Sequence, residues 1–543
     1  MPFSAFAMPW AVLSVLSVAL PFLFAVTAPP SPNFWPLVFA WCCGAVLAAG
    51  ALARGGQVQT RAQGRRLYRQ AAMVLAWGLL LAAVVGGVVG LLQYLGAEPW
   101  GSPWIHPSSP GQAVGNLRQR NQQATLMAMG VWALLWLWVR MAQAARHWHR
   151  AERGAGRWLG VSLAALLPLL ALASAATVSR TGALQWGVMV VLLCLWRGTP
   201  ARRALPVALL GLAVYVLAAW ALPQVLLHLT GVQGEGLFAR LAGDGRQCSS
   251  RQVMWSNMLH LISLKPWTGW GWGEMGYAHY MTLFPGERFC LLLDNAHNLP
   301  LHLAVELGLP AALLLCVGAA AVVVRARPWR ETDPVRQLAW GLLALVGVHS
   351  LLEYPLWYGP FQVATVFALL LLLWRSGGGW ARRWLCGWLW RLGALACLVG
   401  GGLLATAAYQ YRTVSQLYKP ADQRPAALRD VRAVPVPSGT LFPDQVRFAW
   451  LTTHALTAAN AAEMHAAALA LLHFSPEPRV VEKLIASAQA LGRDDEVAFH
   501  VRRYRIAYPA DHAHWLARQT RWAPASGAED MTEEREPEAS AAP

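Results

Sequence analysis

Charged residues are scarce in this 543-residue chain: only 13% of it is Asp, Glu, Lys or Arg, whereas 56% is hydrophobic. Long runs of Leu, Ala and Val, separated by short arginine clusters, are typical of a polytopic membrane protein. The formal net charge of +17 would suggest nucleic-acid binding in a soluble protein. Because the arginines stand between apolar runs, membrane topology explains them better, and no nucleic-acid partner is expected.

Motifs for metal, nucleotide and redox chemistry are also missing. The sequence contains no HExxH, no paired CxxC and no Asp-x-Asp in a segment expected outside the membrane. The glycine-rich stretch "WTGWGWGEMG" (267–276) lacks the Lys-Ser/Thr pair of a phosphate-binding loop. We therefore expect a metal-independent protein that needs no cofactor.

Eleven apolar runs predict an all-α, polytopic membrane protein. Two of them, 183–196 and 361–374, are shorter than the ~20 residues that a bilayer normally requires. The runs lie at 8–28, 34–53, 70–96, 121–139, 158–178, 183–196, 204–222, 299–324, 337–352, 361–374 and 392–409.

Arginine clusters occupy alternate loops, so the positive-inside rule places the N-terminus in the cytoplasm and the opposite loops outside. The expected outer segments are 97–120, 179–182, 223–298, 353–360 and 410–543. The transmembrane domain would thus comprise residues 1–409, with 223–298 as a large outer loop.

Cysteine usage agrees with this topology. Six of the eight cysteines lie in or beside apolar runs, where thiols act as small hydrophobic groups. Cys248 and Cys290 are the two in an outer loop. An oxidising compartment favours a disulfide between them.

Polar side chains collect in five outer motifs. "GNLRQRNQQA" (115–124) contains Gln119 and Asn121; "VSRTGAL" (178–184) contains Arg180; "SSRQVMW" (249–255) contains Arg251; "DNAHN" (294–298) contains Asn295, His297 and Asn298; "EYPLWYGPF" (353–361) contains Tyr354 and Tyr358.

Each motif also has an ordinary interpretation. Arg180 could be an interface residue that extends to the headgroups, and Arg251 could begin a solvated helix face. His297 could cap a helix, and the stripe Asn298, His302 and Glu306 could join helices. Their common side of the membrane is what favours a functional site.

Arginine, histidine and amides on one membrane face suit transfer of a sugar from a polyprenyl diphosphate. Guanidinium groups bind phosphate in a bidentate manner and stay charged near lipid. An acceptor hydroxyl must lose its proton as it attacks the anomeric carbon, and imidazole has a suitable pKa for that step. The diphosphate bond supplies the energy.

These motifs resemble the O-antigen ligase/polymerase superfamily of bacterial membrane glycosyltransferases. The resemblance rests on "DNAHNLPLHLAVELGLPAALLL", with "VSRTGAL" upstream and "PWTGWGWG" between them. "GNLRQRNQQAT" and "EYPLWYGPF" are similar to the branch of O-linked protein oligosaccharyltransferases that glycosylate pilins and other periplasmic proteins.

The resemblance implies roles for individual residues. His297 would be the essential histidine, and Arg180 and Arg251 the diphosphate-binding arginines. Gln119 and either Tyr354 or Tyr358 would complete the catalytic site, and Asn121, Asn295 and Asn298 would bind the diphosphate or the glycan. The expected partners are the lipid bilayer, a polyprenyl diphosphate-linked oligosaccharide and a pilin-like acceptor protein. The expected location is the bacterial inner membrane, with the outer segments in the periplasm.

The C-terminal segment has a different composition, with fewer tryptophans and more acidic residues. Residues 484–509 follow the helix–turn–helix pattern of a tetratricopeptide repeat, and 444–474 suggest a degenerate second pair. We expect a periplasmic helical domain over 410–523, either an acceptor platform or a small helical cap. The acidic end, 524–543, is typical of a disordered tail.

Two alternatives to protein glycosylation remain open. An O-antigen ligase or polymerase would use the same chemistry on lipid A core or on a lipid-linked glycan. A flippase or exporter of polyprenyl-linked glycan would also need arginines in a membrane cavity. A transporter, however, normally shows midplane polar sites and internal repeats, whereas these motifs gather on one side.

The topology itself can be tested by fusion. Alkaline phosphatase, which is active only outside the cytoplasm, should be active when fused after Pro420 and inactive when fused after Arg153. The reverse pattern would contradict the site assignment as well, because every candidate residue depends on this orientation.

Overall fold

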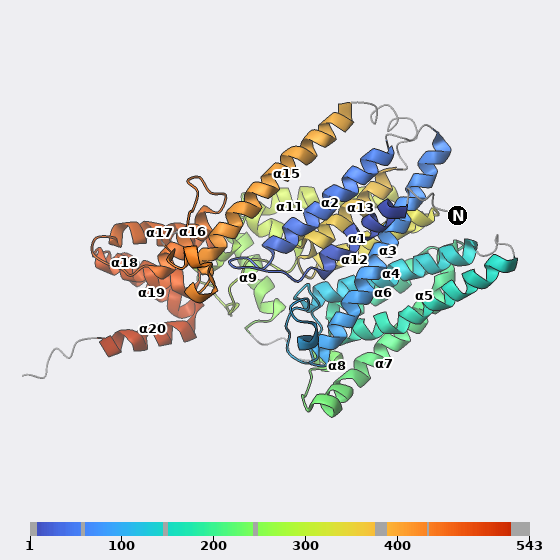
Figure 1. The fold of residues 1–543 in the computed structure, drawn as a ribbon. Coiled ribbons are helices and arrows are strands. Elements are labelled where there is room, and N and C mark those ends of the chain that lie inside the picture. Colours follow the sequence, from blue (N-terminus) through green and yellow to red (C-terminus); the bar gives the residue numbers. More distant parts are fainter. Residues whose placement is uncertain are drawn as a thin grey trace, which may run out of the picture.

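The computed structural model describes residues 8–55, 60–144, 150–242, 248–374, 388–431 and 434–522. Within these ranges the chain forms helices and short turns and contains no strand, which confirms the all-helical prediction. A bundle of long helices carries a smaller group of C-terminal helices at one end (Figure 1). The expected acidic tail, 524–543, lies outside the described residues.

Every expected apolar run contains a helix. These helices are α1 (Met8–Leu23), α2 (Phe34–Gly55), α3 (Arg61–Tyr94), α4 (Arg120–Ala144), α5 (Arg150–Ala176), α6 (Arg180–Leu195), α7 (Leu205–Thr230), α11 (Leu299–Ala326), α12 (Pro334–Ser350), α13 (Gly359–Trp374) and α15 (Trp388–Val414). In the described ranges, five helical segments are long and apolar enough to cross a membrane: Phe34–Arg54, Ala62–Tyr94, Arg120–Ala144, Pro200–Thr230 and Leu299–Arg330. The count of eleven spans stays a prediction.

Several helices extend beyond their expected bounds, and for α3 and α7 the reason is identifiable. Helix α3 begins at Arg61 because Thr60 and Gln63 form a capping box, in which each side chain bonds the other's backbone. Helix α7 continues through Pro223 to Thr230 and ends where Gly231 adopts a left-handed conformation with φ 71°.

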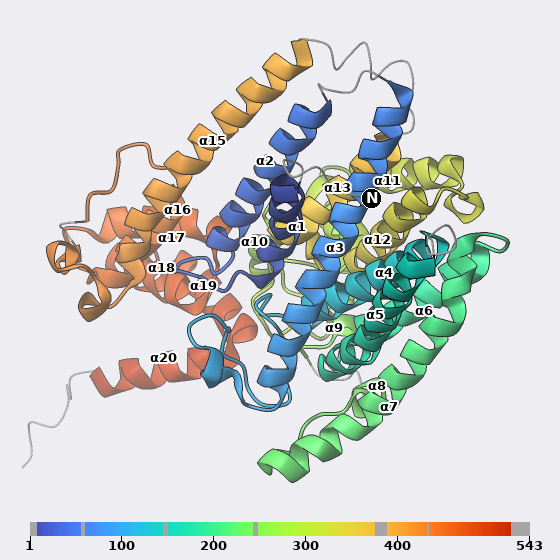
Figure 2. The same cartoon turned by 45° about the vertical axis from the view of Figure 1, so that its right-hand side comes forward.

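Helices α3 and α4 form the centre of the bundle, and α1, α5 and α12 pack around them (Figure 2). Small residues allow the close approach: a Cβ at Gly130 of α4 would lie 2.1 Å from the Cβ of Ala83 of α3. The 18-residue apolar window of α4 is 78% buried, against 11% for that of α11. Helix α4 is therefore a suitable support for a functional site.

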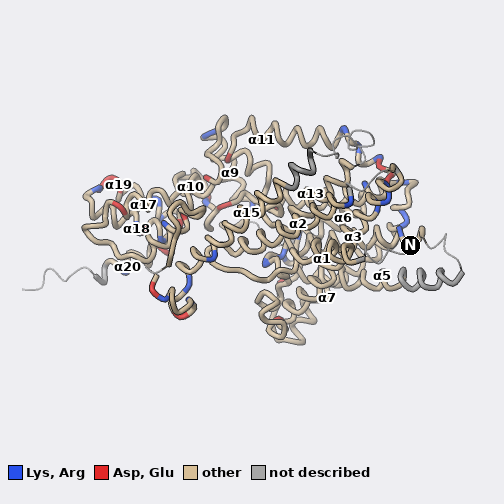
Figure 3. Tube along the Cα trace, turned by 45° about the horizontal axis from the view of Figure 1, so that its top comes forward, with Lys and Arg blue, Asp and Glu red and all other residues tan. Residues whose placement is uncertain are grey.

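Charges are distributed along the bundle as a membrane protein requires. Lys and Arg, with a few acidic residues, gather at the bundle end near the N-terminus, and charges of both signs occupy the opposite end and the C-terminal helices (Figure 3). The middle of the bundle is mostly uncharged.

The segment between α7 and α11, here named the α7–α11 loop (231–298), carries three short helices. They are α8 (Leu237–Ala242), α9 (Arg251–Leu264) and α10 (Met275–Met281). The predicted disulfide between Cys248 and Cys290 is present in this loop. It links the residues just before α9 to the non-helical stretch that leads into "DNAHN".

The α7–α11 loop packs against an interruption in α11 that the sequence did not predict. Gly308 has φ 81° and ψ 166°, and Pro310 follows it. Backbone groups exposed by this break accept and donate hydrogen bonds to the loop: Trp270 N to Val305 O at 2.9 Å, and Leu309 N to Pro266 O at 2.8 Å. The glycine-rich stretch 267–276 thus serves to dock the loop on α11.

The C-terminal helices form a compact group that contacts α10. They are α16 (Pro443–Thr453), α17 (Ala461–Phe474), α18 (Pro478–Ala490), α19 (Asp494–Ala507) and α20 (Pro509–Trp522). Tyr280 of α10 lies in their core and bonds His500 at 3.1 Å, and Glu274 bonds His473 at 2.7 Å. Helices α18 and α19 coincide with the expected repeat unit, and the tetratricopeptide assignment stays a prediction.

Docking of the loop depends on Gly269, whose φ is +68° and whose added Cβ would lie 2.3 Å from the carbonyl oxygen of Glu306. Gly269→Ala should therefore destabilise the folded protein by about 1–3 kcal/mol and lower its melting temperature in detergent. Gly286→Ala, in the same loop but with no atom within 4 Å, should melt like the wild type. Equal melting of the two variants would contradict the docking role.

Candidate functional site

One buried carboxylate joins the outer motifs. Glu353 follows α12, and its side chain is only 4% exposed. Its Oε2 lies 2.6 Å from His297 Nδ1, and its Oε1 accepts a 2.8 Å hydrogen bond from Asn121 Nδ2. The Arg251 guanidinium donates to the same Oε1. Residues from α4, α9, the start of α11 and the turn after α12 thus meet at Glu353.

The ionisation of Glu353 follows from its neighbours. Burial alone would raise its pKa, but the hydrogen bond from His297 and the charge of Arg251 hold the pKa below its ordinary value. The carboxylate therefore accepts, and His297 Nδ1–H donates to it. This arrangement presents Nε2 on the opposite edge of the imidazole ring, whose side chain is 29% exposed.

Two asparagines set the position of His297. Asn295 Oδ1 accepts from His297 N at 2.7 Å, which holds the histidine backbone at φ 47°. Asn298 caps α11 by accepting from Leu301 N at 3.0 Å, and its Nδ2 donates to Leu351 O at 3.1 Å. Both side-chain amides bond the protein backbone. They therefore hold the structure around His297, in addition to the substrate binding expected of them.

The tyrosines lie at different distances from the histidine. The ring of Tyr354 packs edge-on against His297 with centroids 5.1 Å apart. Tyr358 lies behind it, 6.3 Å from the Tyr354 ring. Burial raises the pKa of both phenols, and nearby Asp294 and Glu353 raise it further. Both hydroxyls therefore stay protonated and can donate hydrogen bonds.

The remaining candidates lie around this core. Ser179 Oγ donates to Asn121 Oδ1 at 2.6 Å and also caps α6, so Arg180, the first residue of α6, is next to this contact. The Arg180 guanidinium reaches the carbonyl oxygen of Arg240 in α8. Gln119 Oε1 accepts from Gln122 N at 2.7 Å and caps α4. Gln119 thus lies at the start of α4, two residues before Asn121.

Backbone strain concentrates here. Three of the four non-glycine residues with positive φ in the described ranges are Arg118 (φ 62°), Val178 (φ 51°) and His297 (φ 47°), and the fourth, Arg327, follows the far end of α11. All three lie in the outer motifs, and for a β-branched residue such as Val178 this conformation is costly. Strain of this kind is typical of functional sites that the surrounding structure holds rigidly.

Glu353 and Arg240 were not among the candidates from the sequence. Glu353 stands in the quoted motif "EYPLWYGPF", where a lone acidic residue beside a tyrosine was an available signal. Arg240 lies in a loop with no distinguishing pattern. Among the residues that the structure describes, no three His, Cys, Asp or Glu side chains are grouped as metal ligands would be.

Three protein families match successive parts of the chain. The family described as protein glycosylation ligase matches residues 113–138, which include Asn121. The family described as O-antigen ligase matches 163–316, which include Arg180, Arg251 and His297. The family described as virulence factor membrane-bound polymerase, C-terminal, matches 337–522, which include Glu353.

A curated relative agrees with these matches. The general O-oligosaccharyltransferase of Acinetobacter baylyi is 29% identical over 124 residues, or 22% of this chain and 21% of that protein. The matched region thus spans about a fifth of the relative's length. No solved structure matches the chain. Because successive family matches contain the residues that meet at Glu353, the chain is similar to the O-antigen ligase superfamily and, within it, to the protein-glycosylating members.

Proposed function

We propose that this protein transfers an oligosaccharide from a polyprenyl diphosphate carrier to Ser or Thr hydroxyls of periplasmic proteins such as pilin. The observation that carries the proposal is the single Glu353 carboxylate that holds His297 by one oxygen and Arg251 by the other. A base for the acceptor and a cation for the leaving diphosphate are thereby held side by side.

The reaction can be written with the chain's own side chains. His297 Nε2 takes the proton of the acceptor hydroxyl as its oxygen bonds to the anomeric carbon. The bond from that carbon to the diphosphate oxygen breaks, and Arg251 and Arg180 stabilise the released polyprenyl diphosphate. Glu353 stabilises the imidazolium that forms, as the aspartate does in a Ser-His-Asp triad. No metal or cofactor takes part.

The neighbouring residues have positioning roles. Tyr354, which touches the His297 ring, is the functional tyrosine in preference to Tyr358. Asn121 orients Glu353, and Gln119 sets the start of α4. Asn295 and Asn298 support the substrate site indirectly, because their amides hold the backbone around His297.

The proposed setting is the bacterial inner membrane, with eleven spans in residues 1–409 and the N-terminus in the cytoplasm. The site and the C-terminal domain (410–523) would then face the periplasm. Contacts between α10 and the C-terminal helices suit an acceptor platform joined to the loop that bears Arg251.

The nearest alternative keeps this chemistry and changes the acceptor. Matches to families described as O-antigen ligase and membrane-bound polymerase favour lipid A core or a lipid-linked glycan as that acceptor. A flippase is less compatible, because the site residues converge at one end of the bundle. Intact mass of a periplasmic pilin co-expressed with a glycan donor pathway would show the glycan on protein, or its absence.

His297→Ala should reduce glycan transfer by a factor of about 10²–10⁴, the range typical for loss of a general base, in a protein that still inserts in the membrane. The matched control is His302→Ala, one turn further into α11, where the imidazole pairs with Glu306 at 3.5 Å. This control should retain measurable turnover. A well-expressed His297→Ala protein with near wild-type transfer would refute the mechanism.

Glu353→Gln keeps the shape of the side chain and removes its charge, so transfer at pH 7 should fall by a factor on the order of 10²–10⁴. Because the folded-state pKa of Glu353 is lowered, its charge stabilises the fold above the ordinary carboxyl pKa of about 4.3. That stabilisation is lost as pH falls through the folded-state pKa. Melting curves should therefore separate wild type and variant at pH 7 and converge in strong acid.

Glu331→Gln is the control for Glu353→Gln. Glu331 is also a buried glutamate paired with an arginine, Arg336, at 2.6 Å, but it lies before α12, at the other end of that helix. Its replacement should lower stability and leave the transfer rate of the folded protein near wild type. Equal loss of transfer in both variants would mean that Glu353 acts only through folding.

A further inference from the structure

The short helix α8 contributes an arginine that the proposed mechanism does not use. Arg240 Nη1 donates to Val178 O at 2.8 Å, and its own carbonyl oxygen accepts from the Arg180 guanidinium. Burial lowers the pKa of Arg240 most. The positive charges of Arg120, Arg180 and Arg251 lower it further. The guanidinium groups of Arg120, Arg180 and Arg251 are thus close enough to that of Arg240 to repel it.

One exposed carboxylate offsets part of this repulsion. Glu235, with a side chain 63% exposed, lies 3.3 Å from Arg240 and 4.0 Å from Arg120. An exposed ion pair of this kind contributes little stability and exchanges readily. An anion of higher charge can therefore replace the Glu235 carboxylate between the arginines.

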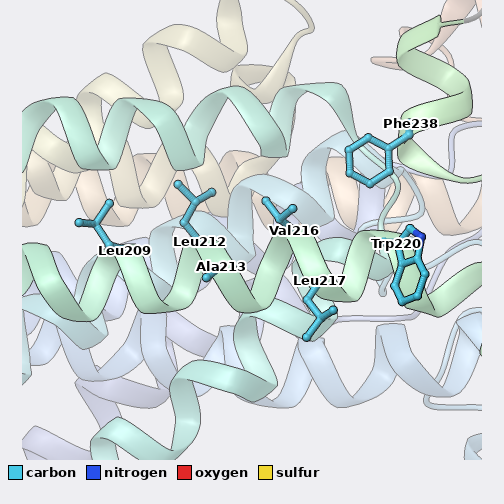
Figure 4. A pocket seen from close by; sticks show the side chains of 7 residues that line it. All are labelled: Leu209, Leu212, Ala213, Val216, Leu217, Trp220 and Phe238. Carbon is cyan, nitrogen blue, oxygen red and sulfur yellow. The ribbon is translucent and has the colours of Figure 1, made fainter.

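An apolar groove begins two residues from Arg240. Phe238 of α8 lines the groove together with a stripe on α7, and the close-up shows its ring near Val216 and Trp220 (Figure 4). The stripe is formed by Leu209, Leu212, Ala213, Val216, Leu217 and Trp220. At 1.5 Å per residue, it extends about 16 Å along the helix.

We propose that α8 and the α7 stripe bind the donor's carrier lipid, with the polyprenyl chain in the groove and the diphosphate against Arg240. This inference rests on the proposed function and names the place of its donor. An apolar track that ends beside clustered guanidinium groups matches a long isoprenoid chain with an anionic head. Arg240 is then a third diphosphate contact, and Glu235 leaves the arginines when the donor arrives.

Direct binding to the full-length protein in detergent tests the proposal without any acceptor. The probes are radiolabelled farnesyl diphosphate and a long-chain polyprenyl diphosphate, with dissociation constants measured for each. Arg240→Ala should weaken both by about tenfold, the effect of one lost charge-assisted hydrogen bond. Glu235→Gln should strengthen both, because it removes the competing carboxylate.

The groove is tested by chain length. Val216→Trp fills the middle of the stripe and should weaken the long-chain probe by about tenfold or more, with little effect on farnesyl diphosphate. The matched control is Leu314→Trp on α11, a lipid-facing position that is 75% exposed. Arg502→Ala and Glu287→Gln, at exposed positions outside the cluster, control for charge. All three controls should bind both probes like the wild type.

Three results would overturn the inference. These are unchanged binding in Arg240→Ala, equal weakening of both probes in Val216→Trp, and displacement of the long-chain probe by an equal concentration of phosphatidylglycerol. The last result would mean that the stripe holds ordinary membrane lipid. A wild-type protein that binds the probes but never glycosylates protein would refute the proposed function and leave this inference standing.

Discussion

The end of the bundle that carries the candidate site is organised by one buried negative charge. A carboxylate that is almost fully enclosed costs several kcal/mol unless cations and hydrogen-bond donors surround it. Glu353 meets that requirement with Arg251, His297 and Asn121, which come from three separate helices or their ends. Removing any of these partners leaves the others poorly satisfied, so the four residues form a unit.

The same requirement explains why several contacts hold the α7–α11 loop in place. Arg251 begins α9, and α9 is held by the Cys248–Cys290 disulfide on one side and by the glycine-rich stretch on the other. That stretch reaches α11 only because Gly308 breaks the helix and frees backbone groups for hydrogen bonds. The interruption of α11 thus holds the loop that bears Arg251 against the helix that follows His297.

The C-terminal helices add further contacts to the α7–α11 loop. Tyr280 of α10 is buried among them, and Arg503 donates to Met281 O at 3.0 Å. Because α10 lies in the same loop as α9, movement of the C-terminal helices would be transmitted toward the site. Under the proposed function, an acceptor bound there would be linked through α10 to the loop that bears Arg251.

The sequence by itself determined that the chain is helical and predicted that the polar motifs share one end of the bundle, because hydropathy and arginine placement are local properties of the chain. It also singled out His297 and Arg251 by residue type. Only the tertiary structure decided that Glu353 joins them, since its partners lie 56, 102 and 232 positions away. Contacts at such separations depend on how helices pack, and no periodicity in the sequence records that. The sequence did not single out Arg240 for the same reason, because the arginines near it are brought together only by the fold.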